Sequence, residues 1–194
     1  MGAGVRLTEE VVSAHLEVSR NTVREAFLIL ASERLVERRA NKGVFVSRPS
    51  AAMVDDVYAV RSLIEPAAVM WGAAPTASEL ARVTAMVEAG RAAVAAGDVP
   101  GMRRANQEVH RWVVGLSCSE RTTRWFEVCL AEMWLVFHAI NDTGFHTPYV
   151  ERNAQFVALL VAGRREDAAD HLRRYLADAR IDLLGRLASA GVED

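Results

Sequence analysis

The pattern of residues 8–46 constrains the fold more than any other part of this sequence. Two short segments with helical character, residues 8–15 and 20–32, are separated by a three-residue turn, residues 16–18, and the residue Ser19. Ser19 is a favourable N-cap for the second segment, whose apolar residues recur at helical spacing as Val23, Phe27 and Leu30. Two helices joined by so short a turn are typical of a helix-turn-helix, whose second helix can enter the major groove of DNA.

A basic β-hairpin is predicted directly after the second helix. Two β-rich runs, residues 35–39 and 44–46, flank a turn of sequence Ala-Asn-Lys-Gly, and Asn and Gly favour such a turn. Lys42 and Gly43 at the tip place a cation and a small backbone where they can approach phosphates or the minor groove. The sequence therefore predicts a winged helix-turn-helix domain over residues 1–48.

The rest of the chain has no convincing strand pattern. A polar, Pro-containing break at residues 47–50 precedes six amphipathic segments joined by short connections. The predicted helices are 53–73, 77–96, 99–116, 119–140, 148–162 and 165–189. We therefore predict a mainly α fold, in which a winged helix with a small hairpin precedes an all-α antiparallel six-helix bundle over residues 53–190.

Charge and composition narrow the functional classes. Residues 1–50 hold eight Arg and Lys against six Glu, a net charge of +2. Residues 51–194 hold fifteen Arg against nineteen Asp and Glu, a net charge of −4, so the whole chain has a net charge of −2. A basic front and an acidic back fit a nucleic-acid reader joined to another module. Two cysteines in helical patterns, no secretion signal and no long apolar stretch indicate a cytoplasmic protein without a membrane partner. Without a phosphate-binding glycine loop or nucleophile elbow, an enzyme is not expected.

Three segments of the N-terminal region resemble the GntR superfamily: Val18-Ser19-Arg20-Asn21-Thr22-Val23-Arg24-Glu25-Ala26, then residues 35–39 and 43–46. The helical remainder resembles the FCD effector domain of the FadR subfamily, through Arg61 with Ile64 and Glu65, residues 106–110, and residues 162–163. The resemblance implies a transcription regulator that acts as a homodimer. Its two recognition helices would read the half-sites of a palindromic double-stranded DNA operator, and a small carboxylate-bearing metabolite would modulate that binding.

Candidate DNA-binding residues lie at the start of the second helix and at the hairpin tip. Arg suits bidentate contact with guanine, whereas hydroxyl groups suit phosphate oxygens. The alternative is that these residues are solvated caps and a surface ion pair such as Arg20–Glu25. The candidates are Ser19, Arg20, Asn21, Thr22, Arg24, Lys42 and Gly43.

The resemblance also implies a metal position in the bundle. Many family members hold a divalent metal through an Asp or Asn, a His four residues later, and one His from each of the last two helices. These positions fall at Asn106, His110, Asn153 and Tyr175, which we call the polar quartet. With two histidines absent, Asn106 and His110 are only weak candidates for Zn²⁺, Ni²⁺ or Mn²⁺, and we expect no tightly held metal.

The polar quartet can instead form the polar floor of a pocket for an organic effector, with Arg61 fixing its carboxylate. Two alternatives remain open: the quartet is a self-satisfied hydrogen-bonded cluster, or Arg61 pairs with Glu65 at i,i+4. Less favoured replacement metal ligands are His138, His146 and His171. Aromatic residues of the third and fourth bundle helices are expected chiefly in the core, with Trp134 or Phe137 as possible pocket residues: Trp112, Trp125, Phe126, Trp134 and Phe137.

Two features depart from the GntR pattern. Family members carry a full helix before the first one predicted here, where this sequence has only residues 1–5, so part of the winged-helix core is expected to be exposed. Glu17 stands at a turn where the family prefers Gly, because the conformation there is left-handed. The alternative function is therefore a helical ligand-binding and dimerisation protein that has lost DNA binding. A small metal-dependent enzyme built around His110 is the least favoured alternative.

Overall fold

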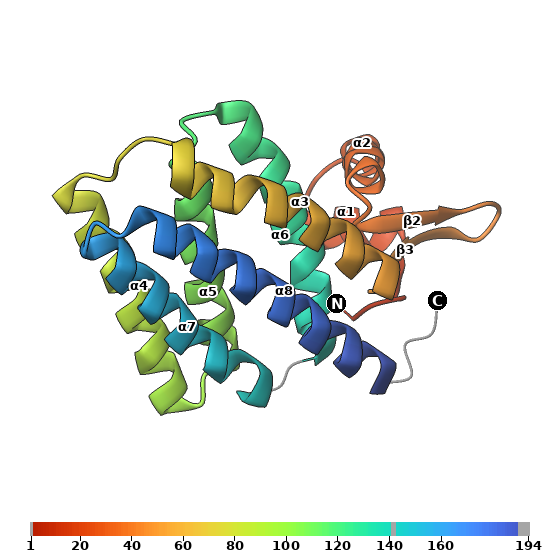
Figure 1. Cartoon of the computed structure of the whole chain (residues 1–194). Helices are drawn as coiled ribbons and strands as arrows, with labels where there is room; N and C mark the ends of the chain where they lie inside the picture. Colours follow the sequence, from red (N-terminus) through yellow and green to blue (C-terminus); the bar gives the residue numbers. More distant parts are fainter. Residues whose placement is uncertain (1, 141–142, 190–194) are drawn as a thin grey trace.

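The computed structural model describes residues 2–140 and 143–189. Figure 1 shows a small winged-helix region beside a larger helical bundle. The winged helix comprises β1 (Arg6–Leu7), α1 (Glu9–Leu16), α2 (Arg20–Ser32), β2 (Val36–Arg39) and β3 (Gly43–Val46). The bundle comprises α3 (Ala51–Trp71), α4 (Ala77–Ala96), α5 (Val99–Gly115), α6 (Glu120–Ile140), α7 (Thr143–Val161) and α8 (Arg165–Ser189). The predicted fold class is confirmed; of the predicted domain limits, residues 1 and 190 lie outside the described part.

The turn between α1 and α2 forms as its residues predict. Glu17 has φ 55°, the left-handed conformation expected at that turn. The Ser19 hydroxyl accepts the backbone N–H of Thr22 at 3.1 Å, which confirms the predicted N-cap of α2. Val23 and Phe27 are buried on one side of α2, and most of its other residues are exposed.

The wing is a three-stranded antiparallel sheet in the order β1-β3-β2. Arg39 lies opposite Gly43 at the tip of the β2–β3 hairpin, where Asn41 adopts a left-handed conformation. β1 pairs with β3, with Arg6 opposite Phe45. This two-residue strand was not predicted, because it is too short to show an alternating pattern.

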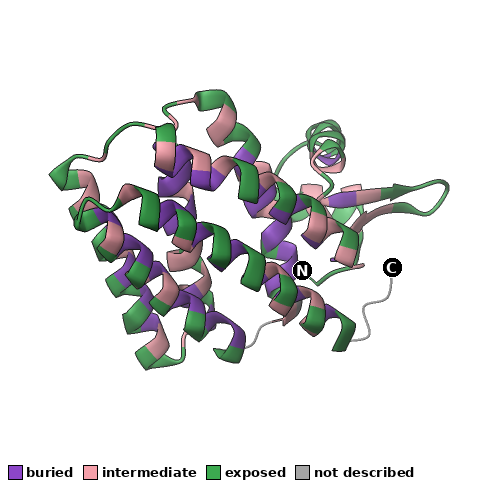
Figure 2. Ribbon diagram, in the orientation of Figure 1, coloured by how far each residue is buried: buried purple, intermediate pink, exposed green. Residues whose placement is uncertain are grey.

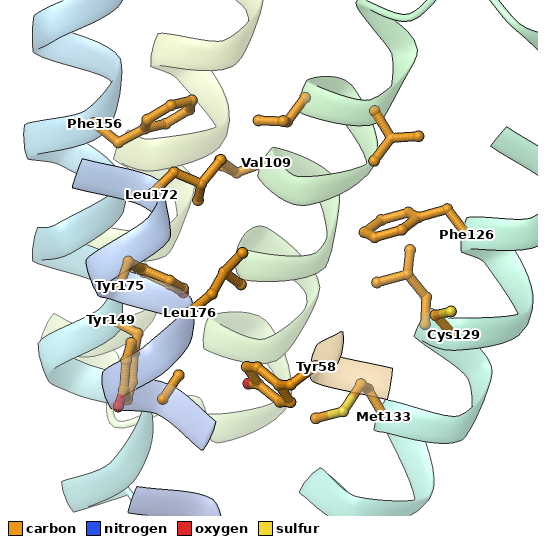
Figure 3. Close-up of a cluster of buried hydrophobic side chains, with 14 of the residues drawn as sticks. Tyr58, Val109, Phe126, Cys129, Met133, Tyr149, Phe156, Leu172, Tyr175 and Leu176 are labelled. Atoms are coloured by element: carbon orange, nitrogen blue, oxygen red, sulfur yellow. The ribbon is translucent and has the colours of Figure 1, made fainter. Parts of the chain in front are cut away.

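Six helices form the bundle, in which α3 packs along α8 and α4 packs against α5 and α7. Buried residues gather between the helices, whereas the winged helix is largely exposed (Figure 2). Figure 3 shows core side chains from different helices meeting, among them Val109 of α5, Met133 of α6, Phe156 of α7 and Leu176 of α8. Side-chain caps begin α3 at Ser50 and α4 at Thr76.

Two expectations about the bundle need correction. α7 begins at Thr143 rather than at residue 148, because Pro148 lies in its second turn instead of opening the helix. The predicted break at 141–144 falls partly outside the described residues. Trp125 and Trp134, expected chiefly in the core, lie on the outer side of α6 and are 61% and 44% exposed. Within the described residues, no helix is both long and apolar enough to cross a membrane.

Candidate DNA-binding surface and buried polar cluster

The N-terminal half of α2 presents an exposed polar surface. All five predicted residues of this segment, from Ser19 to Arg24 without the buried Val23, are exposed. Because Val23 and Phe27 anchor the opposite side of the helix, the polar side chains are held outward. Ser19 and Thr22 hydroxyl oxygens lie 2.8 Å apart, so the cap also fixes one edge of this surface.

Acidic residues of α1 hold the two arginines of α2. Arg24 donates from Nε and Nη2 to the two carboxylate oxygens of Glu9, at 3.0 and 2.8 Å. This hydrogen bonding lowers the pKa of Glu9, so the carboxyl is ionised. Arg20 pairs with Glu10 at 3.2 Å, and not with Glu25, the surface ion pair that the sequence left open. These pairs are solvent-exposed and contribute little to stability, so phosphate oxygens can replace the carboxylates at small cost.

Lys42 and Gly43 lie exposed at the tip of the wing, as predicted. Gly43 has φ 106°, which disfavours a side chain there, and the Arg6 guanidinium packs against it: a Cβ on Gly43 would lie 3.2 Å from Arg6 Nε. Arg6 therefore adds a cation to the wing that the sequence analysis missed. Its only signal was a basic residue next to Leu7 in the short segment before α1.

The bundle brings the four residues of the polar quartet together. Asn106 Oδ1 accepts from Asn153 Nδ2 and from the Tyr175 hydroxyl, each at 2.8 Å. His110 Nε2 lies 3.1 Å from the same hydroxyl. Figure 3 shows Tyr175 on α8, near Tyr149 of α7 and Leu172. The i,i+4 spacing on α5 thus places Asn106 and His110 on one face, where α7 and α8 supply the other two residues.

A buried ion pair extends the polar quartet into α3. His110 Nδ1 lies 2.6 Å from Glu65 Oε2, and the other Glu65 oxygen accepts from Arg61 Nε at 2.6 Å. These three side chains are 1%, 0% and 2% exposed. The i,i+4 alternative for Arg61 is therefore present, although its Nη2 atom is buried without a hydrogen-bond partner. Glu65 belongs to the cluster and was not predicted as a site residue.

Burial and charge set the protonation of this cluster. Burial opposes ionisation of Glu65, but the charge of Arg61 and the hydrogen bonds from Arg61 and His110 outweigh it and lower the pKa of the carboxyl. Burial lowers the pKa of His110 and raises that of Tyr175 well above 10. At neutral pH His110 is thus neutral, with Nδ1–H directed to Glu65. Its Nε2 is then an acceptor, so Nε2 and Asn106 compete for the single Tyr175 proton.

This donor set does not fit a tightly held transition metal. It offers one imidazole, whose Nε2 contacts a hydroxyl that stays protonated, and neutral amide oxygens. In residues 2–140 and 143–189, no group of three or more His, Cys, Asp or Glu is arranged to hold a metal ion. The narrow cleft beside Asn106 and Asn153, between α4, α5 and α7, has no room for a water molecule.

The other histidines have contacts elsewhere. His138 stacks on Trp134 with ring centroids 5.0 Å apart, and His171 Nε2 lies 3.0 Å from the Arg152 carbonyl oxygen. His146 packs against Phe137, with ring centroids 5.4 Å apart. None of these described contacts brings the three histidines to the polar quartet, and Phe137 is a buried core residue.

Comparisons with known proteins agree with this architecture. Residues 1–46 match the family of bacterial regulatory proteins called the gntR family, and residues 56–178 match the FCD domain. A solved structure from Rhodococcus sp. RHA1, described as a GntR transcriptional regulator, is 37% identical with a TM-score of 0.87, covering 95% of this chain and 89% of that chain. A solved FCD domain described as metal-free has a TM-score of 0.60 at 12% identity, covering 74% of this chain and 99% of that one, and shares the fold.

Among curated proteins, the Nta operon transcriptional regulator of Aminobacter aminovorans is 33% identical over 122 residues. The match covers 60% of this chain and 56% of that protein, so the chain spans about half the length of this relative. Both domains of the structure are thus accounted for by one known architecture, a GntR winged helix followed by an FCD bundle. The chain belongs to the GntR family of bacterial regulatory proteins and carries an FCD domain.

Proposed function

We propose that this chain is a DNA-binding transcription regulator whose operator binding is modulated by a small molecule in the helical bundle. One observation carries the DNA-binding part. The polar N-terminal residues of α2 are exposed beside a basic wing, while Val23 and Phe27 fix the orientation of the helix. This is the arrangement in which a recognition helix reaches base edges and the wing reaches the backbone.

The test is fluorescence anisotropy with a duplex that the wild-type protein selects from random DNA. Arg20→Ala removes a base or phosphate contact and is expected to weaken binding roughly 5- to 150-fold at fixed salt. Arg24→Ala is expected to act in the same direction. The matched control is Arg121→Ala, which removes an exposed arginine from the first turn of α6. Unchanged affinity in Arg20→Ala and Arg24→Ala, with circular dichroism intact, would contradict the proposal.

We propose a homodimer as the functional unit, because one winged helix makes few base contacts and two half-sites need two copies. Large apolar side chains are exposed on the bundle, including Leu63 and Trp71 of α3 at 77% and 78%. Burial of such residues between two copies would remove apolar area from water. Light scattering is expected to give twice the 21.3 kDa chain mass. A monomer at micromolar concentration would exclude this assembly.

We propose a small carboxylate-bearing metabolite as the effector. The support is Arg61, a fully buried cation with one nitrogen that has no hydrogen-bond partner. Since the cleft beside Asn106 and Asn153 has no room for a water molecule, ligand entry there requires the helices that line it, α4, α5 and α7, to separate. A thermal-shift screen of small mono-, di- and tricarboxylates is expected to find a stabilising compound, whereas the matching neutral amides have no effect. His110→Ala is expected to weaken binding of that compound. If no carboxylate stabilises the protein, this part of the proposal is wrong.

We further propose that the effector acts without a tightly held metal. The donor set of one neutral imidazole and neutral oxygens supports this. Incubation with a chelator is expected to change neither the melting temperature nor carboxylate binding. Stoichiometric zinc or nickel in protein prepared without a His tag, lost in His110→Ala, would contradict it.

One observation favours the alternative, a helical ligand-binding and dimerisation protein without DNA binding. α1 has no buried residue, and apolar side chains are exposed over α1 and α2: Val11, Leu16, Leu28 and Ile29. A winged helix that leaves this surface uncovered holds its recognition helix less firmly. The DNA selection above separates the two functions, because the alternative predicts that no sequence is enriched.

A further inference from the structure

A cavity of about 560 Å³ lies between the winged helix and the bundle. The connection after α2 and the linker after β3 line it from one side, and α3 and α6 line it from the other. Its polar and charged wall includes Arg34, Glu37, Ser47, Arg48, Asp56 and Glu132. The cavity is distinct from the polar quartet and from the recognition surface of α2, and nothing proposed above uses it.

Glu132 is the unusual member of this wall. Its side chain is 7% exposed, and its Oε2 atom is buried without a hydrogen-bond partner. An unpaired buried carboxylate is costly, because burial removes water without supplying a replacement. Burial accordingly raises the pKa of Glu132, the nearby charge of Arg34 opposes this shift, and Asp56 adds to it. Glu132 lines the cavity, so the wall carries one carboxylate whose buried oxygen has no hydrogen-bond partner.

Neighbouring charges are already engaged. Arg34 donates from Nη1 to Asp56 at 2.8 Å, and this pair links the winged helix to α3. Glu37 pairs with Arg39 at 2.8 Å on the wing. These pairs leave Glu132 as the acid of the wall whose buried oxygen has no partner.

The remaining cation of the wall is turned toward the N-terminal segment. The Arg48 guanidinium lies against Gly4, where an added Cβ would be 2.6 Å from Arg48 Nε. A metal ion is a poor occupant, because no three acids, His or Cys in the described part of the chain are arranged to hold one. The apolar part of the wall, including Val36 and Met53, suits hydrocarbon instead.

We propose that this interdomain cavity binds a small aliphatic ammonium compound, with its cationic head on Glu132. An ammonium group has donors only and a full positive charge, which matches an unpaired carboxylate oxygen. The hydrocarbon body lies along the apolar wall. Since the wall belongs to both domains, the bound compound stabilises one orientation of the winged helix on the bundle and couples ligand binding to DNA recognition.

Isothermal titration calorimetry with butylamine tests the site directly, independently of DNA or of the carboxylate effector. Butan-1-ol and butyrate are matched probes that keep the hydrocarbon chain and replace the charge. Wild type is expected to bind butylamine saturably and neither of the other two. Glu132→Gln keeps the side-chain shape and is expected to weaken butylamine roughly tenfold or more. Glu120→Gln, an exposed substitution on the same helix, is expected to leave binding unchanged.

Two further readouts keep the interpretation unambiguous. Without any probe, Glu132→Gln is expected to melt at a temperature at or above that of wild type, because an unpaired buried charge is removed. Arg34→Gln is expected to bind butylamine at least as tightly as wild type, since a competing cation leaves the cavity. Equal binding of butylamine and butan-1-ol, or equal affinity in wild type and Glu132→Gln, would overturn the proposal. Binding by Arg34→Gln alone would overturn it too, because Arg34 would then be the cation that Glu132 holds.

Discussion

The winged helix and the bundle both carry arginine–carboxylate pairs, but they place them in opposite environments. On the winged helix, Arg24 and Glu9 are 60% and 36% exposed, and Arg20 and Glu10 are 63% and 77% exposed. In the bundle, Arg61 and Glu65 are 2% and 0% exposed. Arg24 donates to both oxygens of Glu9 and Arg61 donates to one oxygen of Glu65, but the largest difference between the pairs is their access to water.

That difference separates two tasks. An exposed pair gains little, because water and salt screen it, and its arginine can exchange a carboxylate for a phosphate. A buried pair is held by the cost of leaving either charge alone in a medium of low dielectric constant. The arginines of the winged helix can thus exchange their carboxylate partners, whereas the buried Arg61 of the bundle keeps its partner as long as the helices stay packed.

The largest expected effect comes from breaking the buried pair. Glu65→Ala leaves Arg61 buried without a counter-charge and removes the acceptor of His110 Nδ1. We expect the free energy of unfolding to fall by about 3–5 kcal/mol. Urea unfolding followed by tryptophan fluorescence measures it, because all four tryptophans lie in the bundle.

The matched variant is Glu10→Ala, which removes the partner of Arg20 on the surface. We expect no measurable change in the free energy of unfolding, because Arg20 and Glu10 are both exposed to solvent in the folded protein. Glu65→Gln, which retains shape and acceptor oxygen, is expected to fall between the two. Similar losses in Glu65→Ala and Glu10→Ala would remove the distinction between the two regions.

The next largest effect is a pH dependence located in the bundle. Burial lowers the pKa of His110; the facing Arg61 acts in the same direction, and Glu65 opposes it. The unfolded chain therefore binds a proton near the ordinary value of 6.5 that the folded chain does not bind. Stability is then greatest above this pH and falls as the pH drops through it, by at most about 1.4 kcal/mol per pH unit.

Thermal unfolding of wild type and His110→Gln across this range measures the effect. The variant is expected to show the shallower slope, because one titrating group is gone. Part of the slope remains in the variant, since burial also lowers the pKa of the half-buried His171. Parallel slopes for the two proteins would show that His110 does not titrate with folding.

Much of the fold was predictable because local signals agree with the global arrangement. Ser19 caps α2 as predicted, and α4 and α8 span the predicted residues. The prediction failed where the local sequence is compatible with two structures. Pro148 is acceptable in the first turn of a helix and also, at some cost, further inside, and the packing of α7 selected the second. β1 has no pattern of its own and forms only because β3 offers a free edge.

The site was predictable as a set of positions and not as a network. Spacing alone put Asn106 and His110 on one face of α5, and the family resemblance supplied Asn153 and Tyr175. The role of Glu65 required the distance between α3 and α5, which no sequence pattern gives. Glu132 lies in an ordinary amphipathic helix, so its burial against the winged helix is visible only once the two domains are placed together.

The smallest effect is expected at the exposed pair of Arg24 and Glu9. Glu9 holds Arg24 by two hydrogen bonds, and DNA phosphates must compete with it for the guanidinium. Glu9→Gln removes a negative charge next to the backbone path but leaves an amide oxygen that can still orient Arg24. We expect DNA binding to tighten roughly threefold at low salt, because one screened repulsion with phosphate is lost.

Anisotropy titrations at several salt concentrations measure this gain in affinity. The gain should disappear as the salt concentration rises, and it should exceed that of the control Glu120→Gln in the bundle. Weaker binding by Glu9→Gln at every salt concentration would mean that the carboxylate is needed to position Arg24. The exposed pair would then behave like the buried one, and the two regions would differ in burial without differing in function.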